Sequence, residues 1–212
     1  MPDVNAAASA LCNGQPLILS ILIGPVSTHD TKRILETLEA LRVQSGSPPH
    51  EVIIAHRRLD AASEIIRSQY PAVRVLPCAV GTSLPELRTL AFESSRGEFI
   101  VITEDHCVPP KNWLASILEA FKIAPEGTVA IGGAVENGVC DTVLDWATCL
   151  FEYSAFVPPI HSGPTLALPG MNVAYRRSCI AKVDRAMLLR GFWETTVHPL
   201  LSQKGFILYF KR

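Results

Sequence analysis

Short apolar runs with strand character alternate with amphipathic stretches of helical character through about the first 130 residues. In one helical stretch Ile34, Leu38 and Leu41 share a face after a capping residue at Asp30. Strands that alternate with helices are typical of an α/β fold with a doubly wound, mainly parallel sheet and helices on both faces. The expected strands lie at residues 17–23, 51–55, 73–76, 98–103 and 129–131, and further helices at 61–69, 83–94 and 113–121, the second of these with a Ser83–Glu86 capping box.

The composition is that of a globular protein with a sizeable core. Of the 212 residues 48% are hydrophobic, and a net charge of −1 gives no field that would attract nucleic acid. The six cysteines form no C-x-x-C pair, which argues against a zinc knuckle or a disulfide-stapled secreted module. Neither a secretory signal nor a run of about 20 apolar residues is found, so we expect a cytoplasmic protein that can lie against a membrane.

After about residue 135 the alternation lapses. A helix is predicted over residues 143–156, where the spacing of Trp146, Phe151 and Tyr153 near one face indicates core packing. A Pro/Gly-rich loop at 158–169 follows, then an extended piece at 172–175, a helix near 178–183 and a strand at 206–210. The sequence therefore predicts one domain, 1–212, with a nucleotide-binding half at 16–135 and a half that shapes a second site at 136–212.

Ligands of open α/β sheets bind beyond the carboxyl ends of the strands. The fourth strand is followed directly by Glu104, Asp105 and His106. Alternate side chains at a strand end point to one side, so Glu104 and His106 could hold a divalent cation, with the imidazole admitting Mn²⁺ as well as Mg²⁺. A polar turn that only caps the strand is the alternative. The other strand ends carry Gly24, Pro25 and Val26, then His56 and Arg57, then residues 78–82.

Residues 104–114 (EDHCVPPKNWL) resemble the D-x-D-x-V-P-P-x-W-L stretch of the family 2 glycosyltransferases, which have the GT-A fold. Four further pieces of the sequence resemble the family and occur in the same order along the chain as in the family. The resemblance covers about residues 16–210. The four pieces are residues 51–55, Leu87-Arg88 with 95–98 (similar to A-R-N…A-R-G-E), 170–177 (similar to G-x-N-x-A-x-R-R), and 191–194 with Gly205 (similar to G-F-x-E-D…L…G).

The chain departs from the family pattern in its acidic residues. His56 and Arg57 stand where the family has an Asp-Asp pair, and Glu104-x-His106 replaces D-x-D. Thr195 follows Glu194 where a second acid is usual. These differences motivate an alternative function, a catalytically inactive relative that binds a nucleotide or a partner. A different doubly wound enzyme would need a G-x-G-x-x-G turn after the first strand, and residues 24–27 lack one.

The resemblance implies transfer of a sugar from a nucleotide-diphosphate donor to an acceptor hydroxyl, saccharide or lipid-linked, with inversion and with help from Mn²⁺ or Mg²⁺. It implies Glu194 as the base, unless Glu194 is only a carboxylate that stabilises a helix start. His198, one turn later, is expected to assist Glu194 or contact the diphosphate. Glu104 and His106 are the implied metal ligands, and the implied donor-binding residues are Pro25, Val26, Arg57, Arg88, Glu104, Asp105 and Asn172.

Three of these residues have plainer alternatives. Arg88 either neutralises a donor phosphate, whose geometry a guanidinium matches, or is an exposed helix arginine. Arg57 either compensates for a lost acidic contact or faces solvent. Asn172 either orients the sugar or the acceptor, or braces the loop that carries it.

Overall fold

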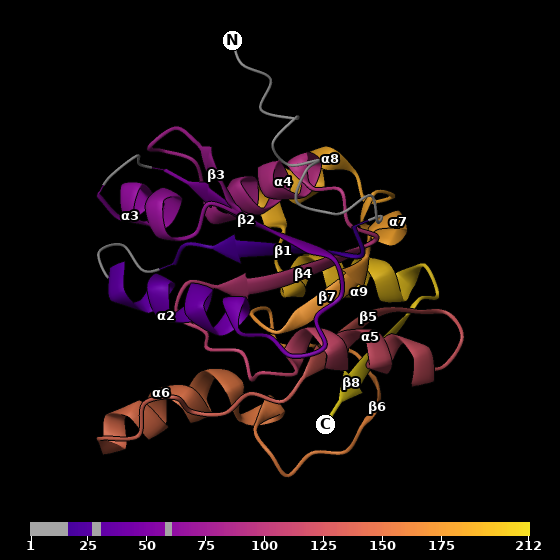
Figure 1. Cartoon of the computed structure of the whole chain (residues 1–212). Helices are drawn as coiled ribbons and strands as arrows, with labels where there is room; N and C mark the ends of the chain where they lie inside the picture. The colour runs from indigo at the N-terminus through magenta and orange to yellow at the C-terminus, as the bar shows by residue number, and fades with distance from the viewer. Residues whose placement is uncertain (1–16, 27–30, 58–60) are drawn as a thin grey trace.

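The computed structural model describes residues 17–26, 31–57 and 61–212, and the helix cap expected at Asp30 lies outside these ranges. One sheet crosses the molecule, with helices packed on both of its faces (Figure 1). The eight strands are β1 (Leu19–Gly24), β2 (His50–His56), β3 (Val73–Pro77), β4 (Phe99–Glu104), β5 (Thr128–Gly133), β6 (Gly163–Thr165), β7 (Val173–Arg176) and β8 (Ile207–Lys211).

The sheet has the order β3-β2-β1-β4-β7-β5-β8-β6. Strands β1 to β4 pair in parallel, and β5 pairs in parallel with β8. Strand β7 is inserted antiparallel between β4 and β5, and β6 runs antiparallel to β8 at the edge. The predicted doubly wound, mainly parallel sheet with helices on both faces is therefore confirmed.

Alternate side chains of the central strands supply two hydrophobic cores, one on each face of the sheet. In β1, Ile21 and Ile23 join the core under α2 (Thr31–Arg42), α3 (Ala61–Gln69) and α5 (Trp113–Ile123). Leu22 joins the opposite core, under α4 (Leu84–Ser94). The continuous apolar runs of the sequence are explained by this burial from both sides.

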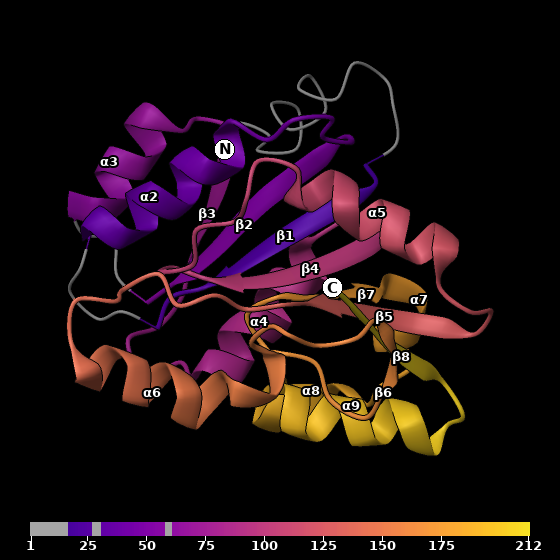
Figure 2. The ribbon, with the colours of Figure 1, turned by 90° about the horizontal axis from the view of Figure 1, so that it is seen from below.

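The opposite core is completed by short helices from the C-terminal part of the chain (Figure 2). They are α7 (Arg177–Ile180), α8 (Arg185–Gly191) and α9 (Glu194–Gln203). The predicted capping box of α4 is present, with the Glu86 N–H donating to Ser83 Oγ and the Ser83 N–H donating to Glu86 Oε2. No described helix is both long and apolar enough to cross a membrane.

Helix α6 (Val143–Tyr153) overturns the prediction of core packing for its aromatic residues. It lies along the outside of the molecule, apart from the helices that cover the sheet (Figures 1 and 2). Phe151 is 90% exposed and Trp146 is 44% exposed, Tyr153 is half-buried, and Cys149 is the buried residue of the helix. Phe151 lies about 140° round the helix from Trp146, so the spacing did not place the three aromatic residues on one face, and it could not say which of them meet the core.

Candidate active site

The ends of β1 and β4 are fastened together by Asp105. Gly24 and Glu104 are partners in the register of the two strands. One step further, the Asp105 N–H donates to the Gly24 carbonyl at 3.3 Å, and the Val26 N–H donates to Asp105 Oδ1 at 3.0 Å. Asp105 is 3% exposed. Of the expected donor-binding residues, Asp105 thus holds the loop after β1 in place, and it leaves Val26 exposed beside buried Pro25.

Arg88 joins β4 to the start of α9. Its side chain is 2% exposed, and its Nη2 donates to Glu104 Oε1 at 2.9 Å. Its Nη1 donates to the Phe192 carbonyl at 3.2 Å, and the guanidinium lies 4.7 Å from the ring centroid of Trp193. Its Nε is buried without a hydrogen-bond partner. The alternative of an exposed helix arginine is therefore wrong, since Arg88 lies at the centre of the site.

His106 lies between two carboxylates. Its Nε2 is 3.7 Å from Glu104 Oε2, and its Nδ1 is 3.6 Å from Asp105 Oδ1. The Asp105 carboxylate raises the pKa of His106 above its usual value, with a smaller contribution from Glu104, while burial and Arg33 act against the rise. Burial raises the pKa of Glu104, and the positive charges of Arg88 and His106 oppose that rise.

Glu104 and His106 fit the demands of a divalent cation. Ligand atoms that are each about 2.0–2.2 Å from one ion lie about 3–4 Å apart, and Glu104 Oε2 and His106 Nε2 are separated by 3.7 Å. Within the described ranges no three His, Cys, Asp or Glu side chains gather around one ion position. The protein could thus supply two ligands, a number typical of Mg²⁺ or Mn²⁺ sites that are completed by phosphate oxygens and water.

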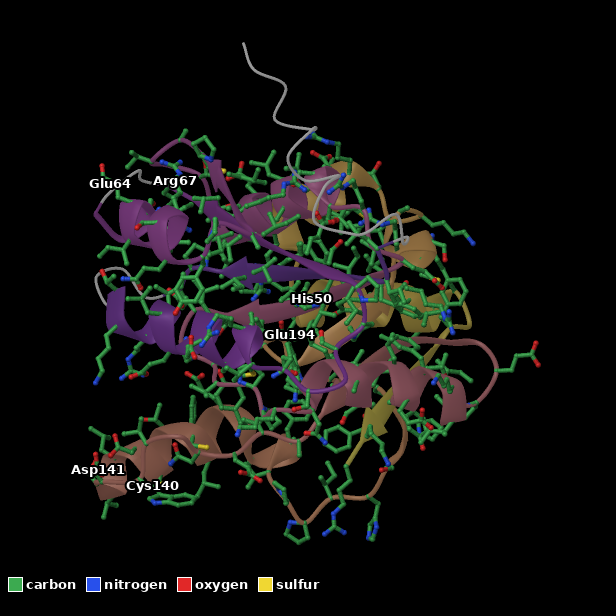
Figure 3. All side chains as sticks on the ribbon, in the orientation of Figure 1. His50, Glu64, Arg67, Cys140, Asp141 and Glu194 are labelled. Atoms are coloured by element: carbon green, nitrogen blue, oxygen red, sulfur yellow. The ribbon has the colours of Figure 1, made fainter. Side chains whose placement is uncertain are left out.

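Glu194 is the first residue of α9 and lies near the middle of the molecule in Figure 3. Its carboxylate packs against the backbone of Gly170, so closely that a Cβ at position 170 would overlap Oε2. The Glu194 carboxylate adds slightly to the raised pKa of Glu104, after the larger effects of burial and of Asp105. The Glu194 side chain is half-buried at the start of α9.

His198 is placed in the core rather than in the site. It is 1% exposed, its Nδ1 accepts the Leu168 N–H at 3.4 Å, and its Nε2 is 2.8 Å from Tyr175 Oη. Burial lowers the pKa of His198 to about 4, so the ring is neutral near pH 7. Spacing of one turn from Glu194 suggested a catalytic role, but that turn directs His198 inward, where it can act only by supporting its neighbours.

Asn172 braces its turn from both ends of its amide. Its Oδ1 accepts from Trp113 Nε1 at 2.8 Å, and its Nδ2 donates to the Ala134 carbonyl at 3.1 Å. Arg57 is used similarly, since its Nε donates to the Thr82 carbonyl at 2.5 Å and links the end of β2 to the loop before α4. Trp113 contacts Asn172 and Trp193 contacts Arg88 across long separations in the chain, so the sequence could not assign these roles to the two tryptophans.

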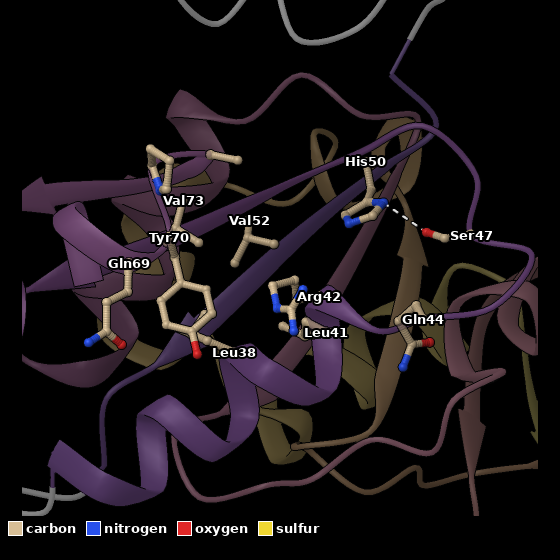
Figure 4. A pocket seen from close by; sticks show the side chains of 12 residues that line it. Leu38, Leu41, Arg42, Gln44, Ser47, His50, Val52, Gln69, Tyr70 and Val73 are labelled. Carbon is tan, nitrogen blue, oxygen red and sulfur yellow. Dashed lines mark hydrogen bonds between the residues drawn. The ribbon is translucent and has the colours of Figure 1, made fainter. Parts of the chain in front are cut away.

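A cavity of about 320 Å³ lies among α2, α3 and the starting ends of β2 and β3, lined by residues that include Tyr70 and His50 (Figure 4). Glu104 stands at the finishing end of β4, which runs parallel to these strands. This cavity is therefore separate from the cluster of Arg88, Glu104 and Glu194.

The chain matches the model of the family "Glycosyl transferase family 2" over residues 26–180. In three dimensions it is similar to TarS 1-349 of S. aureus, with a TM-score of 0.62 and 15% identity, covering 92% of this chain and 58% of that chain. A mannosyltransferase from Pyrobaculum calidifontis, in complex with GDP-Man and Mn²⁺, gives a TM-score of 0.62 at 14% identity, covering 94% and 57%. The chain thus spans little more than half of these structures, and no curated protein matches it in sequence.

Proposed function

This chain belongs to glycosyl transferase family 2, and from that premise we propose that it transfers a sugar from a nucleotide-diphosphate donor to an acceptor hydroxyl with inversion. The observation that carries the proposal is the cluster of Glu104, Arg88 and Glu194, in which Arg88 binds Glu104 and contacts the residues that precede Glu194. The cluster combines a carboxylate for the donor side with a carboxylate for the acceptor side. We assign the donor to residues 16–135 and the acceptor to residues 136–212.

In the proposed reaction the acceptor oxygen attacks the anomeric carbon from the face opposite the diphosphate. The bond between the anomeric carbon and the diphosphate oxygen breaks, and its electron pair leaves with the diphosphate. Glu194 takes the acceptor proton, a contribution of about 10²–10⁴-fold for a well-placed base. Arg88 keeps Glu104 oriented at the donor end, since its guanidinium is held by the Phe192 carbonyl and the Trp193 ring as well.

A divalent cation held by Glu104 Oε2 and His106 Nε2 would stabilise the negative charge that grows on the departing diphosphate. The mannosyltransferase of Pyrobaculum calidifontis was solved with GDP-Man and Mn²⁺, which supports a nucleotide-sugar donor and a cation here. The remaining oxygen of Glu104 accepts from Arg88, so Glu104 can serve both partners at once. A cytoplasmic location with peripheral membrane contact remains a prediction from the sequence.

An inactive nucleotide-binding relative is the second candidate. It is favoured by the replacement of the family's acidic pair by His56 and Arg57. These residues bring no carboxylate to the end of β2, and the Arg57 side chain is already hydrogen-bonded to the Thr82 carbonyl. The two candidates are separated by measuring nucleotide release from a panel of nucleoside-diphosphate sugars with Mn²⁺ or Mg²⁺, beside thermal shifts with the matching nucleoside diphosphates. Release together with a shift supports the enzyme. A thermal shift without nucleotide release supports the inactive relative. The absence of both a shift and release would refute both candidates.

A further inference from the structure

A turn of residues 168–172 lies against the start of α9. We name it the 168–172 turn. The Glu194 carboxylate packs on the backbone of Gly170 in this turn, where an added Cβ would come within 2.8 Å of Glu194 Cδ. A carboxylate in such close contact with a backbone must move when that backbone moves. The position of the 168–172 turn therefore helps to set the position of the Glu194 oxygens.

Asn172 fixes the end of the 168–172 turn that leads into β7. Its side chain accepts from Trp113 and donates to the Ala134 carbonyl. Its own carbonyl accepts the Gly133 N–H at 3.3 Å. These bonds hold one end of the turn to α5 and to the end of β5. The other end, at Leu168, needs an anchor of its own.

His198 anchors the turn at Leu168. The Leu168 N–H donates to His198 Nδ1 at 3.4 Å, and Leu168 is 0% exposed, so this N–H cannot bind water instead. A buried N–H without a partner is costly, which favours the position of the turn in which the bond is made. Glu194 and His198 are four residues apart on α9, a spacing that places side chains on one helix face. That face therefore meets the turn twice, at Gly170 and at Leu168.

The second ring nitrogen of His198 keeps the imidazole in the orientation that this contact needs. The ring is neutral near pH 7 and carries one N–H, and since Nδ1 accepts, the proton lies on Nε2. Nε2 therefore donates to Tyr175 Oη at 2.8 Å. Tyr175 is 2% exposed and belongs to β7, the strand that follows the turn. The imidazole thus links α9, the 168–172 turn and β7.

We propose that His198 is a positioning residue, which accepts the Leu168 N–H and so fixes the turn that supports the Glu194 carboxylate. The inference rests on the proposed function for the role of Glu194 as the base. It rests on the hydrogen bonds and close contacts of the turn for the way in which the carboxylate is held. The competing explanation is that the Leu168 side chain fixes the turn alone, since it packs closely on Gly132 of β5.

Two substitutions separate the two hydrogen bonds of His198. The side-chain oxygen of Asn can take the place of Nδ1, so His198→Asn keeps an acceptor for the Leu168 N–H and loses the bond to Tyr175. The longer side chain of Gln brings its amide nitrogen near the place of Nε2, so His198→Gln keeps the bond to Tyr175 and loses the bond to Leu168. Urea denaturation should find His198→Gln the more stable, because each variant loses one hydrogen bond and Asn also leaves a cavity in the core.

Hydrogen exchange and NMR of the full chain report directly on the turn. In His198→Gln we expect the Leu168 amide to exchange about tenfold faster than in the wild type. The signals of the Gly170 amide and of the Glu194 carboxyl carbon should move in the same variant. In His198→Asn all of these should stay close to their wild-type values. Unmoved Gly170 and Glu194 signals in His198→Gln would overturn the inference, since the Leu168 side chain would then suffice to fix the turn.

Turnover shows whether the position of the turn matters for transfer, measured as nucleotide release from a panel of nucleoside-diphosphate sugars that includes GDP-mannose and UDP-glucose, with Mn²⁺. For the donor that the wild type accepts, His198→Gln should lower kcat about tenfold and leave KM within about twofold, because a displaced base slows the chemical step and spares donor binding. His198→Asn should keep kcat within about threefold although it is the less stable variant. A kcat that follows stability, with His198→Asn the slower, would show a merely structural role and overturn the inference.

Tyr175→Phe covers the case in which His198→Asn does not fold. It removes the hydroxyl group from Nε2 and leaves Nδ1 to the Leu168 N–H, so the Leu168 amide should stay protected and kcat should exceed that of His198→Gln. A kcat as low as that of His198→Gln, with the Leu168 amide still protected, would overturn the inference. If no donor of the panel is turned over while the NMR results are as expected, the glycosyltransferase proposal fails and the placement of Glu194 by His198 stands.

Discussion

Arg88 and Glu104 are joined by a hydrogen bond of 2.9 Å between Nη2 and Oε1, with the arginine side chain 2% exposed and the carboxylate side chain 13% exposed. A charged pair so far from solvent is costly to break, because the remaining partner is left buried with an unbalanced charge. The pair also positions the start of α9 relative to β4, since Arg88 contacts Phe192 and Trp193 as well as Glu104. Stability and proposed activity therefore depend on the same guanidinium.

Arg88→Leu should lower the free energy of unfolding by about 3 kcal/mol, the usual cost of removing one partner of a buried pair. Arg185→Leu is the control, because Arg185 and Glu93 form an exposed pair that should contribute less than about 1 kcal/mol. Urea denaturation of both variants makes the comparison. Equal losses for the two variants would show that burial of the Arg88 pair has no special energetic consequence.

Glu194→Gln should lower transfer by about 10²-fold or more while nucleoside-diphosphate binding stays within a few fold, because the amide keeps the shape and loses the basicity. Turnover and calorimetry on the same preparations measure the two effects. Wild-type turnover would remove Glu194 from the mechanism. Lost nucleotide binding with little change in turnover at saturating donor would move Glu194 to the diphosphate side.

Gly170→Ala should displace the Glu194 carboxylate without changing its chemical identity. The new Cβ would overlap Glu194 Oε2 and come within 2.8 Å of its Cδ, so the side chain must move. A displacement of about 1 Å at a reacting group can cost about 10²-fold in rate. Gly163→Ala is the control, because no described atom lies within 4 Å of the added methyl group. Similar turnover for the two variants would mean that the position of Glu194 is unimportant.

Glu104 and His106 should make nucleoside-diphosphate binding depend on Mn²⁺ more than on Mg²⁺, since an imidazole suits the softer ion. A ligating imidazole must be neutral, so binding should weaken as the pH falls. Because the pKa of His106 is raised, that loss should begin above about pH 6.5, the ordinary value for histidine. Calorimetry across pH measures it. His106→Asp should retain metal-dependent binding with a preference for Mg²⁺, and undiminished binding in excess chelator would exclude the metal site.

His198 should make the fold sensitive to acid. Its pKa is about 4 in the folded chain and about 6.5 when unfolded, so the unfolded chain takes up a proton first as the pH falls. The free energy of unfolding should then drop by about 3 kcal/mol between roughly pH 7 and pH 4. His198→Gln should lack this part of the pH dependence in urea denaturation, since Gln can still hydrogen-bond Tyr175 and does not titrate. Parallel curves for the variant and the wild type would show that His198 is not buried as a neutral ring.

Much of the scaffold follows from short-range patterns in the sequence. Some of these patterns act within a few residues, so the sequence alone predicts them. They are the apolar runs that become β1, β2 and β4, and the Ser83–Glu86 capping box. The short strand β6 lacks such a pattern and was not predicted. The helix α8 was not predicted either, although its N-cap Asp184 is a local signal whose side chain accepts from the Met187 N–H. Strand β6 forms because β8 provides an edge to pair with, a partner that is distant in the sequence.

The sequence by itself determined the mainly parallel α/β scaffold and the position of Glu104 at the end of a buried strand, because alternating hydrophobicity and strand ends are local properties. The tertiary structure alone decided which polar groups meet. Arg88 and Phe192 are 104 residues apart in the chain, and Tyr175 and His198 are 23 apart, yet each pair is hydrogen-bonded in the interior. The outward direction of the apolar face of α6 was settled in the same way, because an amphipathic helix specifies a face, and only the packing of the rest of the chain determines what that face contacts.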